Sequence, residues 1–81
     1  MLQIEEKLLD LLKSINPKHE YSRDTLLIKN GLLDSLEVIK LINGIENVFL
    51  VEIPIDEMEV DNFQSVAVIE AFINRIGYTG K

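Results

Sequence analysis

Apolar residues recur every three or four positions in three segments of this chain. The first segment, residues 2–15, carries them at Ile4, Leu8, Leu11, Leu12 and Ile15. This spacing puts such side chains on one face of an α-helix, which must then be buried against a partner. Residues 34–50 and 66–76 have the same spacing, whereas the one strand-like run, FLVEIPI, is short and interrupted by Pro54. The sequence therefore predicts an all-α fold.

The length and composition limit how such helices can be stabilised. A chain of 81 residues has room for one compact domain. It holds no cysteine, so neither disulfides nor a thiolate zinc site can stabilise it, and the 47% of apolar residues must do so by packing. We expect a single domain over residues 1–81, with its core at about residues 2–76 and a short C-terminal tail at 77–81.

A long irregular segment separates the first two helices. Asn16-Pro17 ends the first helix, because proline disfavours helical backbone at the residue before it. Residues 16–33 lack sustained periodicity, and an irregular segment of this length in a small domain is often functional. We expect four apolar side chains to anchor it to the core: Tyr21, Leu26, Leu27 and Ile28.

The later part of the chain predicts three further helices. Asp34 can cap the second helix, with Glu37 three residues on as in a capping box, and the helix should run to residue 49 or 50. DEMEV at 56–60 predicts a short third helix, and Ser65 is a cap for the last one. The face of that last helix should be Val66, Ile69, Phe72, Ile73 and Ile76. The expected fold is a small four-helix bundle, with three main helices, one short helix and a long first loop.

The charge balance bears on partners and location. Fourteen acidic and eight basic residues give a formal charge of −6, which disfavours nucleic acid and favours partners with a basic surface. No run of about 18 apolar residues is present, so a membrane span is not expected. The first ten residues, MLQIEEKLLD, are acidic and amphipathic, unlike a signal or transit peptide, which predicts a cytoplasmic protein.

The second helix has two faces on a helical wheel. The predicted core face is Val38, Leu41, Ile42, Ile45, Val48 and Phe49. The opposite face, expected to meet solvent, holds Leu36, Ile39, Lys40, Asn43, Glu46, Asn47 and Leu50. Its three apolar residues lie along one line among charges, which favours a docking surface. The alternative is that Leu36 folds under the preceding loop and that Leu50 lies beyond the helix end.

Ser35 would occupy the first position of this helix, beside unpaired N–H groups of the first turn. A permanent anion, such as a phosphate ester, is favoured at that place by the N–H donors and by the helix dipole. An unmodified serine that merely starts a helix is the commoner case. From the residues alone, a cap and a covalent attachment point both remain open.

The wider sequence resembles a known family. Asp34-Ser35-Leu36, preceded by Gly31 and followed by an amphipathic helix, resembles the attachment motif of acyl carrier proteins. FLVEIPI at 49–55 and NFQSVAVIEAFI at 62–73 resemble that family's approaches to its third and fourth helices, so the likeness covers about residues 2–76. It implies an acyl-carrier-like bundle that carries acyl or aminoacyl groups as thioesters on 4'-phosphopantetheine, a covalent arm from coenzyme A. Such proteins serve fatty-acid, polyketide or amino-acid-derived biosynthesis.

The resemblance implies roles for the matched residues. Ser35 would accept the arm, while Asp34 caps the helix and helps a phosphopantetheinyl transferase to recognise the site together with Leu36. The implied partner-binding face consists of Leu36, Ile39, Lys40, Asn43 and Glu46. Besides the transferase, the implied partners are a loading ligase or transferase and downstream synthases, which would meet a monomeric carrier.

Three positions depart from the fatty-acid carriers of this family. Lys40 and Asn47 stand where those carriers usually have acidic residues, so a partner that relies on an acidic helix should bind less well. Gly31 lies three residues before Asp34, where those carriers have glycine two residues before. NGLLDS is closer to D-alanyl carriers and to free-standing carriers served by adenylating ligases.

A sheltering cleft for the cargo is a further possibility. Its candidate lining residues are Val38, Ile42, Val60 and Ile69. The alternative is that these side chains simply fill the core, which small domains favour because they leave little space unpacked.

Catalytic and metal-binding interpretations find little support in the residues. His19 is the only histidine, and no G-x-S-x-G elbow surrounds Ser35. The acidic run from Asp56 has Asp61 where an EF-hand needs glycine and Ala67 where it needs glutamate. We therefore expect no enzyme and no metal site. The competing hypothesis is an unmodified helical adaptor that docks through its second helix.

Overall fold

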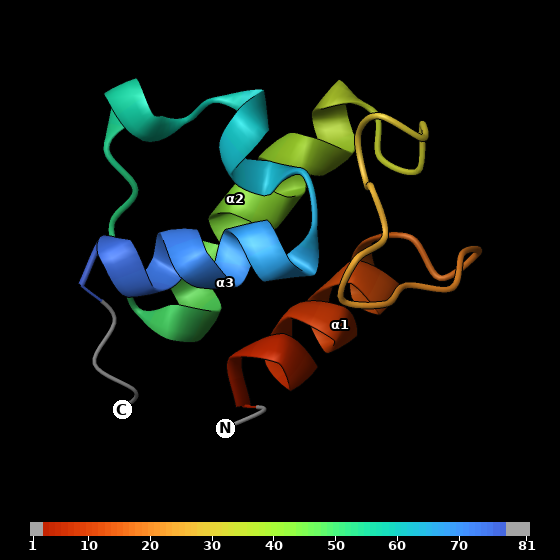
Figure 1. Cartoon of the computed structure of the whole chain (residues 1–81), viewed down its shortest axis with the longest axis horizontal. Helices are drawn as coiled ribbons and strands as arrows, with labels where there is room; N and C mark the ends of the chain where they lie inside the picture. Colours follow the sequence, from red (N-terminus) through yellow and green to blue (C-terminus); the bar gives the residue numbers. More distant parts are fainter. Residues whose placement is uncertain (1–2, 78–81) are drawn as a thin grey trace.

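The computed structural model describes residues 3–77, which form three α-helices and no strand (Figure 1). The helices are α1 (Gln3–Ile15), α2 (Ser35–Phe49) and α3 (Val66–Arg75). Helix α1 packs against both α2 and α3, and in the view of Figure 1 α3 lies in front of α2. The all-α prediction is confirmed. Leu2 and residues 78–81 of the predicted tail lie outside the described residues.

One apolar cluster joins the three helices. Helix α1 contributes Leu8 and Leu12, which lie one helical turn apart and are fully buried. The ring of Phe63 meets that of Phe72 edge to face, with 5.4 Å between the centroids. The other buried apolar members are Leu27, Leu33, Leu41, Ile45, Phe49, Ile53, Val66, Ile69 and Ile73. Burying each large side chain stabilises the fold by about 1.5–3 kcal/mol, so packing replaces the missing disulfides.

The long first loop is anchored by its backbone as well as its side chains. Leu27 is fully buried, and its N–H donates to the carbonyl oxygen of Gln64 at 2.8 Å. The Leu27 carbonyl in turn accepts from the N–H groups of Leu32 and Leu33, at 2.9 and 3.1 Å. Leu33 is buried, an anchor that the sequence did not reveal, whereas the predicted anchor Leu26 is exposed. The turn that buries Leu27 directs its neighbour towards solvent.

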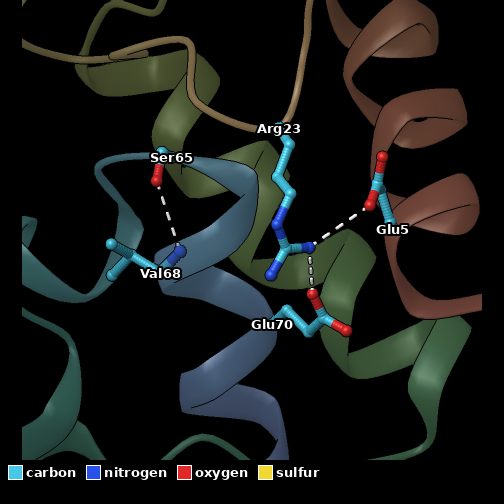
Figure 2. Close-up of polar contacts among 5 residues, drawn as sticks. All are labelled: Glu5, Arg23, Ser65, Val68 and Glu70. Atoms are coloured by element: carbon cyan, nitrogen blue, oxygen red, sulfur yellow. Dashed lines mark hydrogen bonds and ion pairs between the residues drawn. The ribbon is translucent and has the colours of Figure 1, made fainter. Parts of the chain in front are cut away.

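Arg23 joins this loop to two helices (Figure 2). Its Nη1 donates to Glu5 of α1 at 3.2 Å and to Glu70 of α3. The hydrogen bond to Glu70 and the charge of Glu70, followed by Glu5, raise the pKa of Arg23. Figure 2 also shows the Ser65 hydroxyl, which accepts from the N–H of Val68 at 3.2 Å and so caps α3 as predicted. Glu5 is thus part of an ion pair with Arg23.

The predicted short helix over residues 56–60 does not form, so the structure has three α-helices and two 3₁₀ turns in place of a four-helix bundle. The turns are η1 (Ile55–Glu57) and η2 (Val60–Phe63). Two hydrogen bonds of the backbone carbonyl of Glu57 explain the break. It accepts from the Asn62 side chain at 2.7 Å and from the Glu59 N–H at 2.9 Å, which withdraws it from an α-helical ladder.

Gly44 sets how closely α1 approaches α2, which leads to the first prediction. A Cβ on Gly44 would lie 2.6 Å from Cδ1 and 3.2 Å from Cγ of Leu11. We expect Gly44→Ala to destabilise the protein, because overpacking costs about 1–3 kcal/mol and exceeds the helix-propensity gain of at most about 1 kcal/mol.

The matched control is the same substitution in a Leu11→Ala background. With the clash removed, Gly44→Ala should stabilise by about 0.5–1 kcal/mol in urea unfolding. An equal effect of the substitution in both backgrounds would show that Leu11 does not limit this contact.

Candidate functional site

The first turn of α2 is closed by a capping box. Asp34 has an extended backbone, with φ −86° and ψ 179°, and its Oδ1 accepts from the Glu37 N–H at 2.8 Å. The reciprocal bond is also present: Oε1 of Glu37 accepts from the Asp34 N–H at 3.1 Å. The predicted cap is confirmed. Loss of such a cap typically costs about 1 kcal/mol, so this turn depends on both side chains.

Ser35 stands at the first helical position and is exposed. Within residues 3–77, its hydroxyl makes no hydrogen bond, and the N–H groups of Ser35 and Leu36 have no acceptor. The cap is therefore Asp34, and the serine oxygen is accessible to a reagent from solvent. Two free donors at the positive end of α2 suit a phosphate group on that oxygen, so the residues present fit the arm that the motif implies.

The preceding chain turns sharply at Gly31 and then enters the core. Gly31 has φ +75°, a conformation that glycine adopts without steric cost, and its N–H donates to the Ile28 carbonyl at 3.0 Å. Leu33 is buried directly before Asp34. A fixed residue on one side and a helix on the other therefore position Ser35.

Glu37 also contacts the end of α1. Its Oε2 accepts from Nδ2 of Asn16 at 3.1 Å. The carbonyl oxygen of Asn16 accepts from the Tyr21 hydroxyl at 2.7 Å. Burial of the phenol, and to a lesser extent the charge of Glu37, raise the pKa of Tyr21. The sequence showed Asn16 only as a helix end, because a contact across 21 residues leaves no local pattern.

The solvent face of α2 is largely as predicted. Leu36 and Ile39 are 62% and 54% exposed, and Lys40, Asn43 and Asn47 are also exposed. The alternative that Leu36 folds under the loop is wrong. We call these five residues the α2 outer face.

Two residues of the predicted solvent face lie elsewhere. Glu46 is partly buried, and its Oε2 accepts from the Ile53 N–H at 3.0 Å, so its carboxylate holds the chain after α2. Leu50 is 82% exposed but follows the last residue of α2, with φ 54°, as the alternative had it. The acidic contact position that the resemblance implied is therefore already engaged within the chain.

The four candidate cleft residues do not share one environment. Ile69 is fully buried in the core cluster, and Val38 and Ile42 are partly buried against that cluster. Val60 is 53% exposed on η2. The core-filling alternative describes the first three residues, and Val60 stands apart from them.

A hollow of about 340 Å³ does lie between α1 and α2, lined by Lys7, Asp10, Leu11, Ser14 and Val48. None of the cleft candidates lines it. Val48 borders this hollow and is 40% exposed, which corrects its predicted place in the core. Because Val48 is next to the last residue of α2, the hollow lies at the opposite end of the helix from Ser35.

The described residues form neither a metal-binding cluster nor a membrane-spanning helix. Across residues 3–77, no three His, Asp or Glu side chains are grouped to hold a metal ion. His19 meets the Tyr21 ring edge to face, with 6.3 Å between the centroids. No helix in that range combines the length and apolar character that crossing a membrane requires.

No family model, curated protein or solved structure matches this chain.

The exposure of Ile39 leads to the second prediction. Ile39→Glu should change the free energy of unfolding by less than about 0.5 kcal/mol, because the new charge remains in water. Ile45→Glu is the matched control on the same helix: Ile45 is fully buried, and an unpaired charge there should cost about 4 kcal/mol or more. Urea unfolding measures both. Loss of cooperative unfolding in Ile39→Glu would contradict the exposure of Ile39 and show that the other side of α2 faces solvent.

The environment of Tyr21 leads to the third prediction. Its pKa is raised in the folded protein, so the unfolded chain loses the phenolic proton first as pH rises. The stabilisation is complete below about pH 10 and is lost as pH rises through the folded pKa. Tyrosinate absorbance in a Tyr78→Phe background follows Tyr21 alone. Titration of the folded protein at the same pH as the urea-unfolded chain would contradict the burial of this phenol.

Proposed function

We propose that this protein is an acyl carrier that holds acyl or aminoacyl thioesters on a 4'-phosphopantetheine arm at Ser35. The observation that carries the proposal is the exposed, unbonded Ser35 hydroxyl at the first position of a capped helix, within Asp34-Ser35-Leu36. An enzyme that modifies this serine needs only to approach from solvent. The proposal rests on this geometry together with the resemblance of the surrounding sequence to carriers.

The residues at the site have different roles in accepting the arm. The Ser35 oxygen forms a phosphoester bond as the pyrophosphate bond of coenzyme A breaks. The adenosine bisphosphate half then leaves, and the hydroxyl proton passes to a base of the transferase. Asp34 and Glu37 keep the first turn closed, so the free N–H groups of Ser35 and Leu36 lie next to the new phosphate charge. When bound, the arm supplies the thiol that forms the thioester.

A carrier needs no catalytic groups of its own. A flexible tether raises the effective concentration of the cargo at each partner enzyme, so binding of the carrier itself can be weak. The α2 outer face, with Leu36 and Ile39 beside Lys40, is the docking surface that we propose for the transferase, the loading enzyme and downstream synthases. We place this monomeric carrier in the cytoplasm.

The departures from the fatty-acid carriers that the sequence resembles support a proposal about the class of pathway. Lys40 and Asn47 are exposed on the face where fatty-acid carriers usually present acids, and Glu46 is engaged with Ile53. The α2 outer face therefore holds one positive charge and no acid, and a partner selective for an acidic helix would gain little from it. We favour an amino-acid or secondary pathway served by an adenylating ligase over housekeeping fatty-acid synthesis.

The second candidate is an unmodified adaptor. The exposed apolar pair Leu36 and Ile39 favours it as well, because a docking face works without a covalent arm. The two candidates differ in what they require of Ser35: a carrier requires the hydroxyl, and an adaptor does not.

Intact-mass analysis tests the proposal and is the fourth prediction. After incubation with coenzyme A and a promiscuous phosphopantetheinyl transferase, the protein should gain the mass of one phosphopantetheine. Ser35→Ala should abolish the gain without loss of stability, because the hydroxyl makes no hydrogen bond to another described residue. Ser14→Ala, which alters another exposed serine, is the matched control and should keep the gain. An unchanged wild-type mass would reject the carrier in favour of the adaptor.

A further inference from the structure

We propose that Asn16, at the end of α1, is a positioning residue for Ser35 and acts through the carboxylate of Glu37. The inference rests on the proposed function for its biological meaning and on six hydrogen bonds of Asn16 and Glu37 for its physics. It assigns to the start of the long loop a part in presenting the attachment serine.

Asn16 has both ends of its side chain and its backbone engaged. Its N–H donates to the Leu12 carbonyl at 2.9 Å, which ties it to the last turn of α1. Its Oδ1 accepts from the Lys18 N–H at 3.1 Å, and its carbonyl accepts from the Tyr21 hydroxyl at 2.7 Å. The two backbone bonds hold the residue in place, and the bond from the Lys18 N–H orients the side-chain amide, so Nδ2 is left to donate to Glu37 Oε2 at 3.1 Å. The orientation of this amide is thus set by its surroundings.

Glu37 connects this anchor to the attachment site. One carboxylate oxygen accepts from the Asp34 N–H and the other from Asn16, while the Glu37 N–H donates to Asp34. Ser35 lies between the two capping residues. Fixing Glu37 at both oxygens therefore restricts the backbone that carries the serine hydroxyl.

The first turn of a helix is where such restriction matters most. Helix ends open locally at low free-energy cost, because their N–H groups lack helical acceptors. A transferase must hold the Ser35 oxygen close to the phosphorus it attacks, and small misplacements of reacting atoms slow a reaction strongly. A side chain from α1 that steadies this turn should accelerate attachment without touching the substrate.

A polarity swap tests the contact directly. Asn16→Asp sets a carboxylate against the Glu37 carboxylate and removes the donor. Glu37→Gln in that background restores a donor, with the direction of the hydrogen bond reversed. The new glutamine oxygen can still accept from the Asp34 N–H, since glutamine also serves in a capping box, and the new aspartate can still accept from the Lys18 N–H. The double variant thus keeps each of these contacts.

Two measurements follow the swap. In transfer kinetics with coenzyme A, Asn16→Asp should lower kcat/KM by about 5- to 10-fold, and the double variant should return to within about twofold of wild type. In amide hydrogen exchange, Asn16→Asp should speed exchange at Glu37. The amide of Ile73, a fully buried residue inside α3, should keep its rate, because an amide away from the helix start exchanges through larger openings of the fold.

The outcomes separate the inference from the proposed function. Modification of Asn16→Asp at the wild-type rate with unchanged Glu37 exchange overturns the positioning role, even if the carrier is real. Equal loss of protection at Glu37 and Ile73 also overturns it, because Asn16 would then support the whole fold. A wild-type protein that is never modified rejects the carrier, and the exchange data alone then decide whether Asn16 orders the turn. Rescue by the double variant in both measurements supports the inference.

Discussion

The burial of Leu27 is the contact on which the arrangement of the long first loop depends. Residues 16–33 contain no periodic apolar pattern that would hold them to a surface by itself. The fully buried Leu27 side chain provides that hold, and its N–H is bonded to Gln64, just before α3. Its carbonyl accepts from two later N–H groups and so turns the chain back towards α2. One residue therefore sets both where the loop meets the core and where it leaves for Ser35.

The position of Ser35 follows from this path. Leu33 enters the core immediately before Asp34, so the cap begins at a fixed point and not at the end of a free loop. Arg23 adds a tie from the same loop to α1 and α3, and Asn16 adds one to Glu37. Leu33 and Asn16 thus secure the helix start itself, Arg23 holds the loop that leads to it, and Ser35 is left exposed. A rigid base with one accessible hydroxyl is what covalent modification by another protein requires.

The sequence predicted the parts of this structure that local chemistry determines. The 3.6-residue spacing located α1, α2 and α3, and the patterns at Asp34 and Ser65 located their caps, because a cap is decided within four residues. The sequence did not predict contacts between distant segments. Leu33 was missed as an anchor, and Val48 was wrongly placed in the core. The run at 56–60 is divided between two 3₁₀ turns because Asn62 bonds to the Glu57 carbonyl. Each of these three features depends on the neighbouring segments that contact the residue, and the apolar pattern of a single segment does not encode those contacts.

The charge of the protein and the charge of its α2 outer face differ, and this bears on how a partner would bind. The chain carries −6, yet the α2 outer face holds Lys40, two asparagines and no acid. Exposed acids are most closely spaced on the connection after α2, at Glu52, Asp56, Glu59 and Asp61. Long-range attraction of a basic partner depends on the summed field and survives this rearrangement, whereas close contact on α2 depends on local groups. For a carrier of this kind, the encounter would be steered by the acidic connection, and the fit on α2 would be decided by Leu36, Ile39 and Lys40.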